Sequence, residues 1–377
     1  MRVALVTETW LPSVDGIVTR LVATVRELHA AGHDVLVIAP EGPGSTLTGA
    51  TVRTVPTVGA TFLYGGKRWG LPLPRVGRYL REFDPDVVHL VNPVLLGAAG
   101  LLAARRQHRR IVASYHTDIA RYARHYQLGA AVPLIWSLLR ALHGRAHLNL
   151  ATSTASVDDL AGHGITDVRL WPRGVDLRRF HPAPGPRRAG RPVALYVGRL
   201  AAEKGLERLA PLATPAGGFR LVLVGDGPAR AQLERTLPPD TVFTGMLHGD
   251  ALAEAYRSAD LFVFPSTTDT LGLVLVEALA SGLPVLAADS PAARTTLFGT
   301  TAARFFPVER PVDLPACARA LLNDDHRAEA RRHAAESGWD TATHGLLALY
   351  RGVLTTQESS PLPYQSWSSR APGRVKK

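Results

Sequence analysis

Cysteine and lysine are scarce in this sequence. Among 377 residues the single cysteine is Cys317. One chain therefore builds neither a disulfide framework nor a cysteine-ligated zinc cluster, and we expect a reducing, cytoplasmic compartment. Lysine occurs at only four positions in a chain with 43 basic residues. Because Lys204 is the only lysine between residues 68 and 375, a codon bias toward arginine does not account for it.

A long uninterrupted apolar run is also absent. The run at residues 3–6 is too short for the core of a signal peptide. The apolar stretch at residues 87–104 is interrupted by His89, Asn92 and Pro93, which predicts a strand followed by a helix, not a membrane span. With 46% apolar residues and a mean hydropathy of +0.03, the chain is globular, and its length suits two domains of about 150 residues each.

Both halves of the chain begin with the same pattern. Residues 2–7 form a short apolar run, followed by a glycine-containing loop at 12–16, a helical pattern at 17–31 and a second strand at 35–39. The second half repeats this plan with an apolar run at 192–197, a loop at 198–205 and further strands at 219–224, 242–244, 261–264 and 285–288. Strands and helices that alternate in this way predict parallel sheets covered on both faces.

We therefore predict an α/β fold of two Rossmann-like, doubly wound domains that face a cleft. The expected units are residues 1–180, a linker at 181–192, and residues 193–340. A helix at 341–354 is expected to pack back on the first domain, and the Ser- and Pro-rich, basic tail at 355–377 to be disordered. In such folds ligands lie at the carboxyl ends of the strands.

Two carboxylates stand out in the second half. Asp269 follows the strand at 261–264, and Glu277 lies inside the apolar helical segment that begins near Gly272. A carboxylate among apolar neighbours is costly unless it is hydrogen-bonded, and two adjacent ribose hydroxyls are suitable partners for it. The alternative is an exposed Glu277 and an Asp269 that caps the helix.

A pair of cations follows the first strand of the second half. Arg199 and Lys204 lie on the loop at 198–205, at the carboxyl end of a strand. A planar guanidinium and a compact ammonium together suit a diphosphate; the alternative is an ordinary pair of surface cations. In the first half, Gly16 is placed where the backbone can approach a phosphate, and His116 follows the strand at 110–113.

Basic residues are concentrated between residues 101 and 147. This strip has eight arginines and one acid, Asp118, with Tyr122, Tyr126 and Trp136 among them. We expect it to seat the first domain on an anionic membrane, and codon bias is the alternative. A nucleic-acid-binding protein is a further alternative for a chain of net charge +11, but no reader motif accompanies the arginines, so no nucleic acid is expected.

Taken together, these motifs resemble the retaining glycosyltransferases of family 4, whose GT-B fold has two Rossmann-like domains. The resemblance extends to about Leu354. Within the family the chain is most similar to actinobacterial GDP-mannose-dependent lipid alpha-mannosyltransferases. The matching segments are residues 12–16, 115–118, 173–176, 197–199, 204–205, 224–228 and 243–245, with the paired acids around Gly272.

The resemblance implies that residues 1–180 bind the acceptor and that residues 193–340 bind the donor nucleotide. Glu277 corresponds to the acid that holds the ribose, and Arg199 and Lys204 to the pair that neutralises the diphosphate. Gly16 corresponds to the loop glycine near the same diphosphate. Met246 is expected near the base.

The resemblance also assigns residues to the reacting sugar. Gly272 and Leu273 match the helix start that offers amides to the donor, and His116 matches a histidine near the sugar. Asp269 departs from the family, which usually has Glu there followed by Pro-Phe. With Arg199 and Lys204, we take His116 and Asp269 as the catalytic group.

The implied activity is transfer of a hexose from a nucleoside diphosphate sugar to a hydroxyl of a lipid or other small acceptor. The subgroup resemblance points to mannose as the hexose and GDP-mannose as the donor. No metal or other cofactor is expected, because the Arg199 and Lys204 pair takes the metal's place. One alternative uses a UDP-sugar on a natural-product or thiol-pathway acceptor. Another is a nucleotide-sugar epimerase or hydrolase, which turns over donor without an acceptor.

Overall fold

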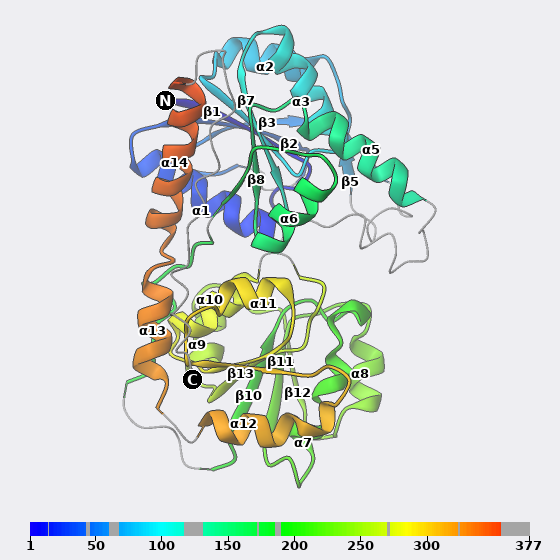
Figure 1. Cartoon of the computed structure of the whole chain (residues 1–377), viewed down its shortest axis with the longest axis vertical. Helices are drawn as coiled ribbons and strands as arrows, with labels where there is room; N and C mark the ends of the chain where they lie inside the picture. Colours follow the sequence, from blue (N-terminus) through cyan, green and yellow to red (C-terminus); the bar gives the residue numbers. More distant parts are fainter. Residues whose placement is uncertain are drawn as a thin grey trace, which may run out of the picture.

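The computed structural model describes residues 1–13, 15–42, 46–59, 68–116, 131–171, 173–184, 190–269, 272–322 and 325–355. Asp118, Tyr122, Tyr126 and the tail beyond residue 355 lie outside these ranges. The described residues form two α/β domains, one above the other in Figure 1. Each is a parallel sheet with helices on both faces, as the alternation of apolar strands and helical segments predicts.

The N-terminal domain is built on a seven-stranded sheet in the order β3-β2-β1-β6-β7-β8-β9, in which all neighbours are parallel. The strands are β1 (Arg2–Thr7), β2 (Asp34–Pro40), β3 (Thr51–Val55), β6 (Val87–Val91), β7 (Arg110–Tyr115), β8 (Leu148–Ala151) and β9 (Val168–Leu170). A separate antiparallel pair joins β4 (Thr57–Gly59) to β5 (Arg68–Gly70). The helices are α1 (Gly16–Ala30), α2 (Arg75–Phe83), α3 (Leu95–Arg106), α5 (Val132–His143) and α6 (Thr154–Gly162).

The C-terminal domain has a six-stranded parallel sheet in the order β12-β11-β10-β13-β14-β15. Its strands are β10 (Val193–Val197), β11 (Arg220–Val224), β12 (Val242–Gly245), β13 (Leu261–Phe264), β14 (Val285–Ala288) and β15 (Ala303–Phe306). The helical segments are η2 (Ala202–Lys204), η3 (Leu206–Leu209), α7 (Ala210–Ala213), α8 (Arg230–Thr236), α9 (Gly249–Arg257), α10 (Leu273–Ala280), α11 (Pro291–Thr296), η4 (Pro311–Asp313), α12 (Leu314–Leu322) and α13 (Arg327–Ala335).

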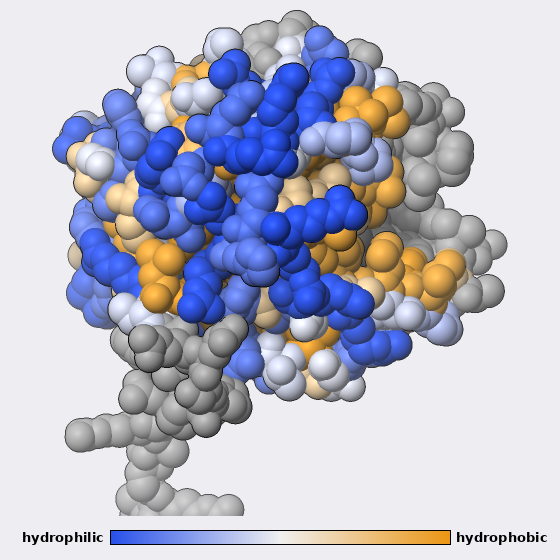
Figure 2. Space-filling model, turned by 90° about the horizontal axis from the view of Figure 1, so that it is seen from above, coloured by the Kyte–Doolittle hydropathy of each residue, from blue (hydrophilic) through white to orange (hydrophobic). Residues whose placement is uncertain are grey.

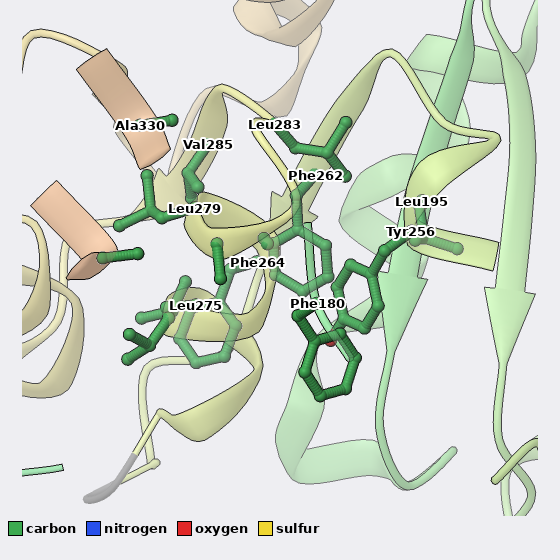
Figure 3. Close-up of a cluster of buried hydrophobic side chains, with 14 of the residues drawn as sticks. Phe180, Leu195, Tyr256, Phe262, Phe264, Leu275, Leu279, Leu283, Val285 and Ala330 are labelled. Carbon is green, nitrogen blue, oxygen red and sulfur yellow. The ribbon is translucent and has the colours of Figure 1, made fainter. Parts of the chain in front are cut away.

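The central strand β13 shows how the C-terminal core is organised. Phe262 and Phe264 point into one hydrophobic cluster with Tyr256 of α9 (Figure 3), whereas Leu261 and Val263 pack into the cluster on the other face. Side chains of successive strand residues point to opposite faces, so a strand that is apolar at every position has both faces covered. Helix α10 is apolar almost all round and is correspondingly buried.

The chain crosses between the domains twice. After β9 it passes through Val175, whose backbone N–H donates to the Ser337 carbonyl oxygen at 2.8 Å on the returning segment. A Cβ atom at Gly174 would lie 2.0 Å from the ring of Trp339, so only glycine fits at this crossing. Trp339 begins α14 (Trp339–Thr355), which packs against α1 along one side of the N-terminal domain (Figure 1).

The carboxyl edges of the two sheets face each other. Thr154, just after β8, has its hydroxyl oxygen 3.2 Å from that of Thr295 on α11, which follows β14. This contact spans the two domains, and it brings the loops that follow the strands of both sheets to the same region. The candidate residues of both halves lie on these loops or at the helix starts that follow them.

Candidate active site

Arg199 lies on the loop that follows β10, and a buried tyrosine at the end of that strand is hydrogen-bonded to this loop. The Tyr196 hydroxyl donates to the Arg199 carbonyl oxygen at 3.0 Å. Gly198 has φ of +153°, and a Cβ atom there would lie 2.7 Å from the same hydroxyl, so the loop needs glycine at this point. The Arg199 side chain is exposed, with its guanidinium available to an anion.

Lys204 and Asp269 form an ion pair across 65 residues of sequence. The Lys204 Nζ atom, at the end of η2, lies 2.5 Å from Asp269 Oδ1 on the loop after β13. The exposed fractions of these side chains are 13% and 27%, so the pair is partly shielded from water and stronger than a surface pair. Asp269 therefore has a cation as partner and does not cap the following helix.

Hydrogen bonds from side chains to backbone carbonyl oxygens hold together the two loops that carry Lys204 and Asp269. The Arg208 guanidinium donates to the Pro265 carbonyl oxygen at 3.2 Å, and the Thr268 hydroxyl donates to the Glu203 carbonyl oxygen at 3.2 Å. Both bonds join the segment after β10 to the loop after β13. They fix the position of Asp269 relative to Lys204, although the two residues belong to different strand ends.

Helix α10 begins beside this pair. Gly272 is its N-cap residue with φ of +60° and ψ of 38°, in the left-handed region that favours glycine. Leu273, the first residue of the helix, is buried. The start of a helix offers backbone N–H groups and the positive end of its dipole, which together suit a phosphate.

Glu277 lies one turn further along α10. The Tyr256 hydroxyl donates to its Oε2 atom at 2.8 Å. Burial raises the pKa of the Glu277 carboxyl to about 7, while this hydrogen bond lowers it. The side chain is partly exposed, so it lies between an apolar core and the surface at the carboxyl edge of the sheet.

Met246 and Gly16 lie at two other strand ends. Met246 follows β12 and is 49% exposed, next to Gly245, whose carbonyl oxygen accepts from the Gly225 N–H at 2.8 Å. Gly16 is exposed at the start of α1, where the Asp15 side chain caps the helix by accepting from two backbone N–H groups. Two of the backbone N–H groups at the start of α1 therefore already have a partner in Asp15.

His116 lies at the end of β7 but is buried, with 3% of its surface exposed. Its Nε2 atom is 2.9 Å from Ser114 Oγ, its backbone N–H donates to Asn92 Oδ1 at 3.2 Å, and its ring packs edge-on against Trp171 at 5.4 Å. Burial, with Arg20 as the next cause, holds the pKa of His116 well below its usual range. The imidazole is therefore neutral at physiological pH.

The C-terminal half of the arrangement matches the chemistry of a nucleoside diphosphate sugar site. Sequence comparison gives a consistent result: the profile described as Glycosyltransferase Family 4 matches residues 14–179, and that of Glycosyl transferases group 1 matches residues 191–324. A GDP-mannose-dependent alpha-mannosyltransferase from Mycolicibacterium smegmatis is 39% identical over 94% of this chain and 98% of its own. Its counterpart from Mycobacterium tuberculosis is 40% identical over 95% and 99%.

The chain belongs to glycosyltransferase family 4. Its fold is that of the GT-B enzymes, since the structure superposes on a sucrose-phosphate synthase from Thermosynechococcus elongatus with a TM-score of 0.74, covering 93% of this chain and 98% of that one at 20% identity. The expected fold, family and enzyme class are thus confirmed.

The structure of this glycosyltransferase also shows residues that the sequence did not single out. Glu8, directly after β1, is buried and accepts from the backbone N–H groups of Val94, Leu96 and Gly97 at the start of α3. Burial raises the pKa of the Glu8 carboxyl, although the backbone hydrogen bonds lower it. The only indication of Glu8 in the sequence was its position directly after an apolar strand. Tyr256 gave none, since a tyrosine in an amphipathic segment is indistinguishable from a core residue.

Within the described residues, His, Cys, Asp and Glu side chains form no group of three or more suited to hold a metal ion. The positively charged groups at this edge include Arg199, Lys204 and the first turn of α10. Arg199 and Lys204 lie at the end of β10, and α10 follows β13, the neighbouring strand in the sheet. Cations and helix dipole therefore act on one region of the carboxyl edge.

Proposed function

We propose that this glycosyltransferase transfers mannose from GDP-mannose, with retention of anomeric configuration, to a hydroxyl of a lipid or other small acceptor. The observation that carries the proposal is the meeting of Lys204, Asp269 and the start of α10 where the neighbouring strands β10 and β13 end, in a chain 39–40% identical to two GDP-mannose-dependent alpha-mannosyltransferases. This site offers cationic groups to a diphosphate and a carboxylate to a sugar.

The diphosphate is bound by Arg199, Lys204 and the amides that begin at Gly272 and Leu273. Charge accumulates on the diphosphate as the bond to the sugar breaks, so preorganised cations and amides stabilise the transition state more than the ground state. Gly16, on the opposing domain, lets the backbone approach the same group. No covalent nucleophile is assigned; the leaving oxygen takes the acceptor's proton on the face from which the acceptor attacks.

The other residues that contact the donor lie along the same carboxyl edge of the C-terminal sheet. Glu277 accepts hydrogen bonds from the ribose hydroxyls, and Met246 lies against the base. Asp269 accepts hydrogen bonds from the mannose hydroxyls while Lys204 holds its other side. Because mannose and glucose differ at the 2-hydroxyl, discrimination rests on a polar contact that one epimer leaves unpaired.

His116 acts from the acceptor side as a neutral hydrogen-bonding group. Its ring is held by Ser114 and Trp171, so its orientation is set before substrate arrives. A neutral imidazole both donates and accepts, which suits a group that orients sugar or acceptor hydroxyls. It does not suit a cationic partner for the diphosphate.

The exposed side chains of helix α5 favour a lipid as the acceptor. Leu134 and Leu138 are 74% and 45% exposed one turn apart, and Arg140 near the end of α5 and Arg145 just after it are also exposed. Figure 2 views the molecule from the N-terminal-domain end, where hydrophobic and strongly hydrophilic side chains alternate on the surface. Apolar side chains flanked by arginines suit the interface of an anionic membrane, and we place the protein there as a peripheral enzyme.

One expectation about this surface changes with the structure. Trp136 takes no part, because it is buried and stacks on His163 with ring centroids 3.6 Å apart. In the described part of the chain no helix combines the length and apolarity needed to cross a bilayer. The contact that we propose is made by the exposed side chains of α5.

A donor panel monitored by thermal unfolding tests the proposal. The purified full chain is heated with GDP-mannose, UDP-glucose, UDP-GlcNAc or UDP-glucuronate, each with its free nucleotide as control. A donor at 100 times its dissociation constant stabilises by about 2.7 kcal/mol, and we expect GDP-mannose to reach this at the lowest concentration. Preference for a UDP-sugar contradicts the donor assignment and favours the alternative acceptor class.

A further inference from the structure

Tyr256 connects the hydrophobic core of the C-terminal domain to the candidate donor site. It lies on α9 with no exposed surface, and its hydroxyl donates to Glu277 Oε2 on α10 at 2.8 Å. The ring is fixed by two phenylalanines: Phe180 lies perpendicular to it at 5.4 Å, and Phe262 is tilted at 5.7 Å. Figure 3 shows the three labelled rings in one cluster with Leu275 and Leu279 of α10.

This hydrogen bond is the main polar interaction of the tyrosine. A buried tyrosine hydroxyl needs a partner, and its second acceptor, the Val274 carbonyl oxygen, is 3.5 Å away, too far for a strong O–H bond. The single hydroxyl proton therefore goes to Glu277, in a charge-assisted bond when the carboxyl is ionised. One carboxyl oxygen of Glu277 is thus anchored from within the core.

The anchoring also affects the ionisation of Glu277. Burial raises the pKa of this carboxyl to about 7, and the bond from Tyr256 is what opposes that rise. Tyr196 interacts electrostatically with Tyr256. On the helices packed against α10, Arg331 and His333 bond backbone carbonyl oxygens and Arg294 pairs with Asp289, so Tyr256 is the polar side chain that acts on Glu277.

We propose that Tyr256 is a positioning residue for the donor: it orients the Glu277 carboxylate and keeps it ionised, so that the carboxylate accepts hydrogen bonds from the ribose of the nucleotide sugar. The inference rests on the proposed donor role of Glu277. The same geometry explains why a carboxylate is tolerated in an otherwise apolar helix. Without the hydroxyl, the carboxyl loses the bond that fixes its orientation, and its pKa rises further.

The test is a double-mutant cycle with Tyr256→Phe, Glu277→Gln and the two combined, measured on the full chain by calorimetric titration with GDP-mannose. Tyr256→Phe keeps the ring that packs on Phe180, so the fold should persist, and circular dichroism checks this. Tyr350→Phe is the matched control, since it removes a fully buried hydroxyl that bonds His89 at 2.7 Å in the other domain. The control should change the dissociation constant less than about twofold.

We expect Tyr256→Phe to raise the dissociation constant at pH 7 by about tenfold. At pH 8.5 the loss should be smaller than at pH 7, because a larger share of the variant's carboxyl is then ionised. In the Glu277→Gln background the same substitution should change the constant less than about twofold. A loss of equal size in that background, a loss independent of pH, or no loss at all overturns the proposal.

The cycle also separates this inference from the donor proposal. If the wild-type protein binds UDP-glucose and not GDP-mannose, the donor assignment fails, and the same cycle with UDP-glucose still gives one of the outcomes above. If the wild-type protein binds neither nucleotide sugar, the role of Glu277 and the role of Tyr256 both fail.

Discussion

Lys204 Nζ lies 2.5 Å from Asp269 Oδ1, joining the loop after β10 to the loop after β13. The ammonium is thus placed between a carboxylate of the protein and the region where the helix dipole of α10 begins. In the donor complex that we propose, the diphosphate shares the cation with Asp269 and does not meet a bare ammonium. The pair also fixes Asp269 before the sugar binds, which is the preorganisation that electrostatic catalysis needs.

Lys204→Ala should lower kcat/KM for transfer by about 100- to 1000-fold, because one preorganised charge at the leaving diphosphate is lost. The variant should fold, since Lys204 is joined to the rest of the domain through a partly exposed pair. Steady-state kinetics and a thermal unfolding curve measure the two effects. Arg310→Ala removes an exposed cation of the same domain and is the control. A Lys204→Ala enzyme with near-normal turnover would exclude Lys204 from the diphosphate site.

Glu277→Gln should weaken donor binding by about 1.5–3 kcal/mol, because a charged hydrogen-bond acceptor is lost. The same change should stabilise the protein without donor. Burial raises the folded-state pKa of this carboxyl from 4.5 to about 7, so the stability present below pH 4.5 is lost as pH rises to 7. The neutral glutamine avoids this loss, which is worth about 3 kcal/mol at pH 8.

Denaturant unfolding at pH 4 and pH 8 measures this effect. We expect wild type and Glu277→Gln to have similar unfolding free energies at pH 4 and the variant to be more stable at pH 8. Equal stability at both values would mean that the protein environment does not raise the pKa of this carboxyl. Unchanged donor affinity in a folded variant would remove Glu277 from the ribose site.

The β-strands and the acidic pair could be predicted from sequence for a common reason. Continuous apolar strands such as β13 have no other stable place than a covered sheet, and a glutamate in an apolar helix has few harmless explanations. The edge strand β3 alternates between exposed and half-buried residues, so its signal is weaker. It was not predicted, and neither were β8, β9, β15 and the β4–β5 pair.

The unpredicted parts of the site are contacts between distant segments. Nothing near Glu8 in the sequence indicates that its carboxylate binds the start of α3, 86–89 residues later. His116 was correctly placed at the end of a strand, but its burial depends on Trp171, which lies on the crossing to the other domain. Both contacts depend on tertiary packing, which local pattern does not encode.

His116→Gln should reduce transfer about 100-fold or more while changing donor affinity by less than about threefold, because the residue is assigned to the acceptor side. Burial keeps the wild-type imidazole neutral, so its ionisation should contribute no limb to the pH–rate profile above pH 6. Comparing profiles of wild type and variant measures this. A limb near pH 6.5 that disappears in the variant would show that His116 titrates, contrary to its buried position.

Leu134→Ser combined with Leu138→Ser should reduce co-sedimentation with vesicles that contain anionic lipid by about tenfold, since two exposed apolar side chains on α5 are lost. Val312→Ser is the matched control, because Val312 is also 74% exposed but lies on the C-terminal domain. Wild-type protein should bind neutral vesicles more weakly than anionic ones. Equal binding to both, or no binding, would exclude the proposed membrane surface.

Donor preference tests the central proposal most directly. The purified full chain is incubated with GDP-mannose, UDP-glucose, UDP-GlcNAc or UDP-glucuronate, and release of the nucleoside diphosphate is followed with and without a lipid acceptor extract. We predict that GDP-mannose gives the fastest release and that release depends on the acceptor. Faster turnover of any UDP-sugar would contradict the mannosyltransferase assignment, and equal release without acceptor would indicate a hydrolase.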